Sequence, residues 1–92
     1  MDRAAAELLA LKALAWLGGD DERLGAFLGA SGLSPGEVRS RVQDPDFMLA
    51  LLDFVTADDD AVRAFCDAEG LDYDAPLAAR RALPGGEEVH WT

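Results

Sequence analysis

The sequence has few residues that could stabilise a small protein by anything other than packing. Of its 92 residues, one is a cysteine, Cys66, and one is a histidine, His90. A single cysteine cannot form an internal disulfide, so the fold depends on packing and is compatible with a reducing compartment. No apolar run approaches the roughly 20 residues of a membrane span, and the first residues lack the pattern of a secretory signal. We therefore expect a cytoplasmic protein that does not enter the membrane.

Basic residues are also scarce. Lys and Arg number 8 against 18 Asp and Glu, which gives a net charge of −10. Binding to a phosphate backbone requires clustered Lys and Arg, so we do not expect nucleic acid as a partner. Half of the residues are hydrophobic, which suffices for a folded core despite the acidity. A chain of this length forms one domain, and we assign residues 1–86 to a single helical domain and 87–92 to a flexible tail.

What the sequence does contain is an internal repeat. Residues 14–33 align without a gap with residues 52–71, at an offset of 38. Eight of the twenty aligned pairs are identical and four more keep their character, among them Trp16 with Phe54. The identical pairs are Leu14/Leu52, Asp20/Asp58, Asp21/Asp59, Ala26/Ala64, Phe27/Phe65, Ala30/Ala68, Gly32/Gly70 and Leu33/Leu71. This pattern predicts two copies of one helical unit, at about 4–45 and 46–85.

Capping residues and helix formers predict six helices, over about 3–17, 21–30, 35–43, 45–57, 59–70 and a last one ending near 82. The predicted N-caps are Asp2, Asp20, Ser34, Asp44 and Asp58, with Asp72 or Asp74 for the sixth helix. Ser34-Pro35-Gly36-Glu37 is a capping box, the strongest local signal in the chain. Gly32 and Gly70 suit the left-handed residue that closes a helix.

The first and fourth helices are apolar around most of their circumference, so each must be surrounded by its own domain or by a partner. Because the repeat equates them, we expect them to pack on each other near a pseudo-twofold axis. We expect the second helix to bury Leu24, Phe27 and Leu28, and the sixth to bury Leu77. The predicted fold is all-α, a compact bundle of about six short helices built as two pseudo-repeated three-helix units.

The acidic clusters and the cysteine do not indicate a catalytic, cofactor or metal site. From Asp58, an EF-hand template fails at Val62 and at Arg63, which replaces the required glycine. Most of the acids lie at predicted helix starts, where the helix dipole favours negative charge. Cys66 aligns with Leu28 of the other copy, which indicates a core position rather than a nucleophile. We therefore predict that the protein is not an enzyme and has no cofactor.

Candidate partner-binding residues are two arginine pairs and a terminal tryptophan: Arg39, Arg41, Arg80, Arg81 and Trp91. The arginines could contact an acidic partner, or they could only stabilise the helix C-termini at which they lie. Trp91 could anchor a partner or fold back on the core. A helix, a glycine turn and a short capped helix also resemble a DNA-reading helix-turn-helix, but the charge and the lack of a basic recognition face oppose that interpretation.

Several segments, in order, carry a family resemblance: LAWL, DDERLGAFL, SGLSPGEVR, DPDFMLALLDFV, AFCDAEGLD and ARRALPG. They resemble a family of short alphaproteobacterial proteins catalogued as a domain of unknown function, number 3572. The resemblance covers about residues 5–85. It implies a small bacterial cytoplasmic helical protein and brings no activity, cofactor or catalytic residue.

The sequence supports two hypotheses about function. The first is a non-enzymatic protein–protein interaction module, with a homodimer as one version, motivated by the surplus apolar surface of the first and fourth helices. The second is an acidic regulator that binds a basic nucleic-acid-binding protein by mimicking DNA. Differences between the copies, such as Gly25/Arg63 and Leu28/Cys66, are where specific function is expected.

Overall fold

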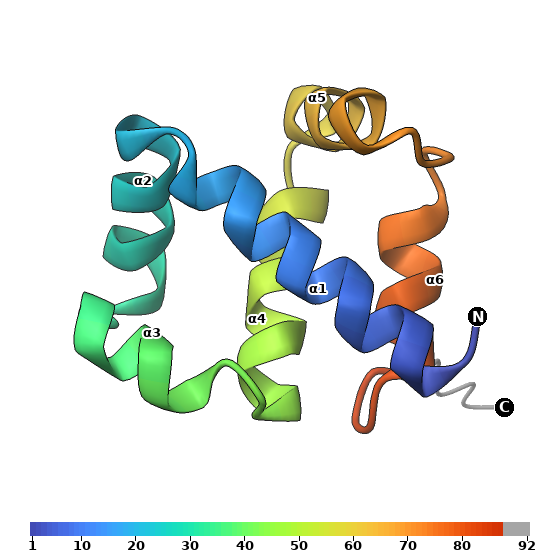
Figure 1. Cartoon of the computed structure of the whole chain (residues 1–92), viewed down its shortest axis with the longest axis horizontal. Coiled ribbons are helices and arrows are strands. Elements are labelled where there is room, and N and C mark those ends of the chain that lie inside the picture. Colours follow the sequence, from blue (N-terminus) through green and yellow to red (C-terminus); the bar gives the residue numbers. More distant parts are fainter. Residues whose placement is uncertain (88–92) are drawn as a thin grey trace, which may run out of the picture.

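The structure is a computed structural model that describes residues 1–87, and these residues form six α-helices and no strand (Figure 1). The helices are α1 (Arg3–Gly18), α2 (Asp21–Ser31), α3 (Pro35–Arg41), α4 (Pro45–Thr56), α5 (Asp59–Glu69) and α6 (Ala75–Ala82). The all-α prediction is confirmed. The third helix ends at Arg41, slightly before the expected 43. Of the predicted tail, 87–92, residues 88–92 with Trp91 lie outside the described residues.

Side-chain caps determine where most helices begin. Asp2 accepts a hydrogen bond from the Ala5 amide at 2.8 Å, and Asp58 accepts one from the Asp60 amide at 2.9 Å. Asp20 and Asp44 cap α2 and α4 in the same way. At α3, the Ser34 hydroxyl and the Glu37 carboxylate accept from each other's backbone amides, which completes the capping box. These caps satisfy amides that have no partner within the helix.

The sixth helix has its N-cap at Asp74, one of the two predicted positions, but without the side-chain cap that was expected there. Asp74 occupies the N-cap position of α6 but makes no side-chain capping hydrogen bond. Its φ of −88° and ψ of −7° are helical rather than extended, and the following proline, Pro76, has no amide hydrogen to donate. The backbone carbonyl of Asp72 accepts instead from the Ala75 amide at 3.0 Å.

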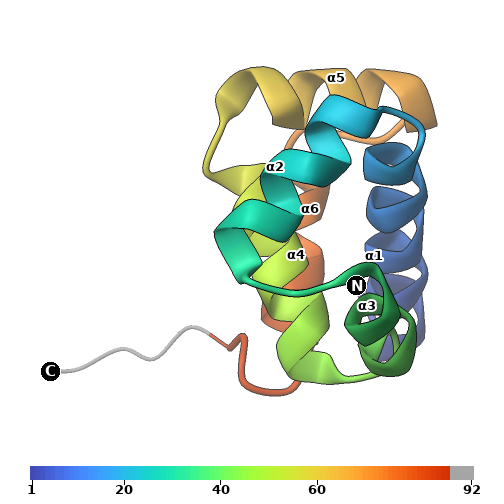
Figure 2. The same cartoon turned by 90° about the vertical axis from the view of Figure 1, so that its left-hand side faces the viewer.

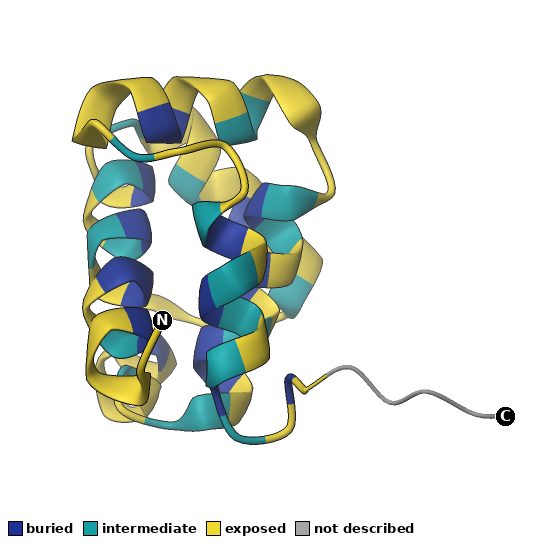
Figure 3. Ribbon diagram, turned by 90° about the vertical axis from the view of Figure 1, so that its right-hand side faces the viewer, coloured by how far each residue is buried: buried dark blue, intermediate teal, exposed yellow. Residues whose placement is uncertain are grey.

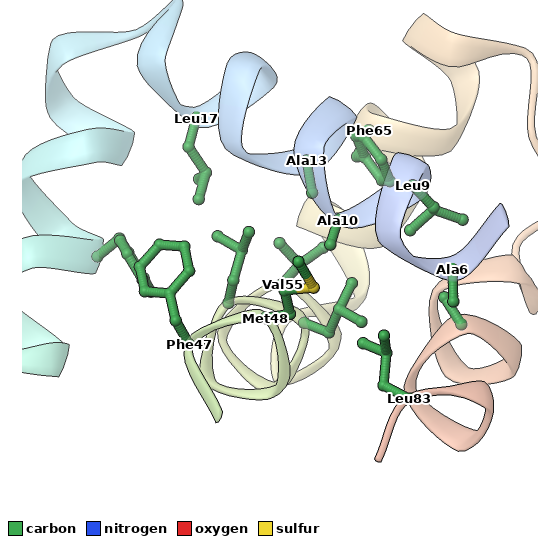
Figure 4. Packing of buried hydrophobic residues seen from close by; sticks show 14 of the residues in the cluster. Ala6, Leu9, Ala10, Ala13, Leu17, Phe47, Met48, Val55, Phe65 and Leu83 are labelled. Atoms are coloured by element: carbon green, nitrogen blue, oxygen red, sulfur yellow. The ribbon is translucent and has the colours of Figure 1, made fainter. Parts of the chain in front are cut away.

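The core forms around α1 and α4, which pack on each other as expected. Three buried alanines of α1, Ala6, Ala10 and Ala13, present a small-residue surface towards α4 and α6 (Figure 4). From α4, Leu52 and Val55 are fully buried. Helices α2 and α5 each contact both central helices, and α6 also packs against both. Helix α3 makes no comparably extensive contact, so the third helices of the two expected units are placed differently.

Two predictions about burial are corrected. Leu77 of α6 is 45% exposed, because α6 turns Pro76 and Ala79 towards the core, and Leu83 after the helix fills the remaining space. For α1 the alternatives of its own domain and a partner stay open, since the described chain leaves Leu8 and Leu11 54% and 46% exposed. Of the three residues expected on the buried side of α2, only Phe27 is buried, and Leu24 and Leu28 are half-buried. Figure 3 shows that the helices have buried residues on one side and exposed residues on the other.

Candidate functional site

The candidate site lies at two turns of the chain: the one that connects the central helix α1 to α2, and the one that connects the central helix α4 to α5. We call residues 16–26 the first joint, between α1 and α2, and residues 54–64 the second joint, between α4 and α5. Helix α1 ends at Gly18 and α4 at Thr56, while α2 begins at Asp21 and α5 at Asp59. The N-caps share one conformation, with φ −138° and ψ 114° at Asp20 and φ −127° and ψ 113° at Asp58. The two joints are therefore built alike, at the sequence offset of 38.

The joints face each other across a groove of about 670 Å³. From the first joint it is lined by Trp16, Leu17, Asp20, Glu22, Arg23 and Ala26. From the second joint it is lined by Phe54, Val55, Asp58, Asp60, Ala61 and Ala64, and additionally by Ala57. Each residue of the first list has its counterpart 38 positions later in the second. The volume is within the range of about 300 to 1,000 Å³ that is typical of ligand clefts. Figure 2 shows α5 lying across this end of the molecule, above α2.

The aromatic residue of each joint packs on a phenylalanine of the other copy's flanking helix. Trp16 of α1 packs on Phe65 of α5 with ring centroids 5.6 Å apart, and Phe54 of α4 packs on Phe27 of α2 at 5.4 Å. Phe27 and Phe65 are buried, whereas Trp16 and Phe54 are only half-buried and line the groove. The partly exposed rings are thus held in place by fully buried ones, at distances typical of favourable aromatic pairs.

The first joint already holds a cation against an aromatic ring. The guanidinium carbon of Arg23 lies 4.1 Å from the centroid of the Trp16 ring. This is a cation–π contact, in which the positive charge is attracted to the negative face of the ring. In the second joint the corresponding position is Ala61, whose methyl group cannot make such a contact with Phe54.

Carboxylates form the negative rim of the groove: they are exposed or half-buried, whereas the apolar residues Leu17 and Val55 are buried. The groove has four acidic residues, Asp20, Glu22, Asp58 and Asp60, against the one arginine of its lining. Asp20 and Asp58 use Oδ1 to cap their helices. Asp60 also lies 3.7 Å from Arg63, in an exposed ion pair. An apolar floor with a negative rim suits a ligand that is apolar and cationic at once.

The family model described as Protein of unknown function (DUF3572) matches residues 3–86. The chain belongs to this family. The matched region includes all six helices, and hence both joints and the whole lining of the groove. No curated protein and no solved structure matches the chain.

The predicted arginine sites lie away from the groove. Arg39 and Arg41 are exposed in the last turn of α3, and Arg80 and Arg81 lie in the last turn of α6. Figure 1 places α3 and α6 on opposite sides of α4, so the structure does not bring the two pairs together. The fifth candidate, Trp91, is outside the described residues.

Arg80 has a structural partner. Its guanidinium forms an ion pair with Asp53 of α4 and donates a hydrogen bond to the Gly86 carbonyl at 3.3 Å. The hydrogen bond to Asp53 raises the pKa of Arg80 above its ordinary value, against the opposing effect of burial. Arg80 therefore links α6 and the following turn to α4.

Cys66 is a core residue, as predicted. It is fully buried, and its thiol donates to the Asp72 carbonyl at 3.4 Å. Burial, together with the negative charges of Asp67, Asp72 and Asp74, raises the pKa of the Cys66 thiol. The neutral thiol is thereby favoured, whereas a nucleophile requires the thiolate.

Two absences among the described residues bear on the site. Among residues 1–87, no group of three or more His, Cys, Asp or Glu side chains could hold a metal ion. Within the same residues, no helix has the length and apolarity needed to cross a membrane.

Sequence reasoning did not identify the groove, although a signal for it was present. The repeat pairs Trp16 with Phe54, which shows that each joint carries an aromatic residue at the same place. It also pairs Arg23 with Ala61, a difference that marks the one cation in the lining. What the alignment could not show is that the two joints face each other.

Proposed function

We propose that the protein is a non-enzymatic helical module that binds another protein through the groove between the two joints. The observation that carries this proposal is the groove itself, about 670 Å³ in volume, with the half-buried rings of Trp16 and Phe54 in its lining. Aromatic residues in a preformed depression are the usual anchors of protein interfaces. The rings are supported by Phe27 and Phe65, so little side-chain conformational entropy is lost when a partner binds.

The polar groups of the groove support binding rather than catalysis. Asp20 and Asp58 cap α2 and α5, which gives both carboxylates a structural role. Arg23 is stacked on Trp16. These groups can attract and orient a ligand of opposite charge, and none of them requires a reaction to explain its position.

Self-association is a second version of the interaction hypothesis, and a different surface favours it. Leu8 and Leu11 of α1 are about half exposed and lie one turn apart, where a second copy could cover them. Light scattering at several protein concentrations tests this version. A mass that stays at that of one chain would contradict it.

The alternative function is that of an acidic regulator which occupies a basic nucleic-acid-binding protein. The net charge of −10 and the acidic rim of the groove are compatible with it. The two hypotheses differ in the partner that they require. A partner that also binds DNA or RNA, and that the chain displaces from nucleic acid, would favour the regulator.

Blocking the groove tests the main proposal. Ala64 is exposed on α5 and lines the groove, whereas Ala68, one turn later on the same helix, is exposed outside it. We expect Ala64→Trp to abolish co-purification of a cross-linked partner from cells of the source organism, and Ala68→Trp to leave it intact. Circular dichroism confirms that both variants fold. Retention of the same partners by Ala64→Trp would overturn the proposal.

A further inference from the structure

The two joints differ in one place that a ligand could fill. In the first joint, Arg23 lies over Trp16, and in the second, Ala61 leaves the corresponding place beside Phe54 without a cation. We infer that this place receives an arginine side chain from a basic segment of a partner protein. The inference rests on the proposed function, and it adds the chemistry of the group that the groove recognises.

The first joint shows that this environment holds a guanidinium. The Arg23 guanidinium carbon is 4.1 Å from the Trp16 ring centroid, at a site that Asp20 and Glu22 also line. An aromatic face together with nearby carboxylates attracts a cation through both the ring quadrupole and the negative charge.

The second joint repeats this environment without its cation. Phe54 corresponds to Trp16, Asp58 to Asp20 and Asp60 to Glu22. Arg63, which does not line the groove, lies 3.7 Å from Asp60, with both side chains exposed (63% and 93%). Such surface pairs contribute little stability, so a partner's arginine can compete for Asp60 at small cost.

Charge opposes a second copy of the chain as the occupant of the groove. A second copy of the chain would bring another net charge of −10 to a rim that already has four carboxylates. A basic segment of a different protein is the complementary occupant.

The groove is large enough for more than one side chain, so a short peptide is a suitable probe for it. Its apolar lining, including Leu17, Val55 and Ala64, can also cover an aliphatic residue next to the arginine. The test uses two short peptides that are identical except at one position between two leucines. One peptide has arginine there and the other has citrulline, which has nearly the same shape and no charge.

Binding of both peptides to the full-length chain is measured by calorimetry and by NMR titration. We expect the arginine peptide to bind about ten-fold more tightly than the citrulline peptide, the difference that a partly desolvated cation–π contact supplies. The Trp16 indole signal and the amides of Ala61 and Ala64 should shift on binding.

Three variants locate the contact. Ala61→Arg should abolish binding of the arginine peptide because it places the chain's own guanidinium beside Phe54. Ala68→Arg, with the same charge change on an exposed part of α5 outside the groove, should leave the affinity within about two-fold, since only long-range charge is altered. Asp58→Asn keeps a good N-cap residue but removes the charge, and should weaken the arginine peptide more than the citrulline peptide.

The outcomes separate this inference from the proposed function. Equal affinities for the two peptides, NMR shifts outside the groove, or no binding of either peptide would each overturn the arginine site. Those results would leave the protein-binding module in place as long as Ala64→Trp still removes the partner. If Ala64→Trp retains the partner, the module itself is overturned, whatever the peptides do.

Discussion

Gly32 and Gly70 end α2 and α5 in the left-handed conformation, with φ of 73° and 67°. A Cβ added at either position would meet no atom within 4 Å, so the cost of a side chain there comes from the backbone alone. We expect Gly32→Val and Gly70→Val each to lower the free energy of unfolding by about 1 to 2 kcal/mol, measured by urea denaturation.

Gly25 provides the matched control, because it lies inside α2 and has nothing within 4 Å of an added Cβ. Gly25→Ala should raise the free energy of unfolding by about 0.5 to 1 kcal/mol, since alanine is the better helix former. If Gly70→Val leaves stability unchanged, the left-handed cap is not required there.

At the scale of the element, the caps of α5 and α6 predict different losses of stability for the same substitution, aspartate to alanine. Asp58 accepts a hydrogen bond from the Asp60 amide at 2.9 Å, whereas Asp74 makes no capping bond. Asp58→Ala should therefore cost about 1 kcal/mol of unfolding free energy. Asp74→Ala should stay within about 0.5 kcal/mol, as is usual for exposed positions without such contacts. Thermal melts of both variants and of Asp58→Asn provide the comparison, and equal losses for the two alanine variants would contradict it.

The helix ends could be predicted because their causes are local. Ser34 and Glu37 are three residues apart, and Gly70 is next to the helix that it ends. The exposure of Leu77 and of Leu8 could not be predicted, because it depends on which sides of α6 and α1 other helices cover. An apolar residue at a helical spacing is equally consistent with a core contact and with an exposed surface.

Only part of the candidate site could be predicted from the sequence, for a related reason. Each joint and its aromatic residue could be read from the repeat, as with Trp16 and Phe54. The groove exists because Trp16 reaches Phe65 and Phe54 reaches Phe27, which are contacts between residues far apart in the chain. Neither the spacing nor the composition of the segments determines such pairings.

At the scale of the whole molecule, the negative charge has two consequences. Acidic residues occupy the caps and first turns of α2 and α5, where they stabilise the helices individually. Together they contribute to a net charge of −10, and the excess of like charges repels within the folded chain. Because the N-termini of α2 and α5 meet at the groove, the same residues that begin these helices give the groove its acidic rim.

Salt should therefore act in opposite directions on stability and on binding. Raising the NaCl concentration from about 0.01 to about 1 M shortens the Debye length from about 30 to about 3 Å. Weaker self-repulsion should raise the melting temperature of the free chain. Weaker attraction should lower its affinity for the arginine peptide, whereas the affinity for the citrulline peptide should change little. Calorimetry and thermal melts in the same buffers measure both effects. An affinity for the arginine peptide that does not fall with salt would show that the acidic rim does not attract the ligand.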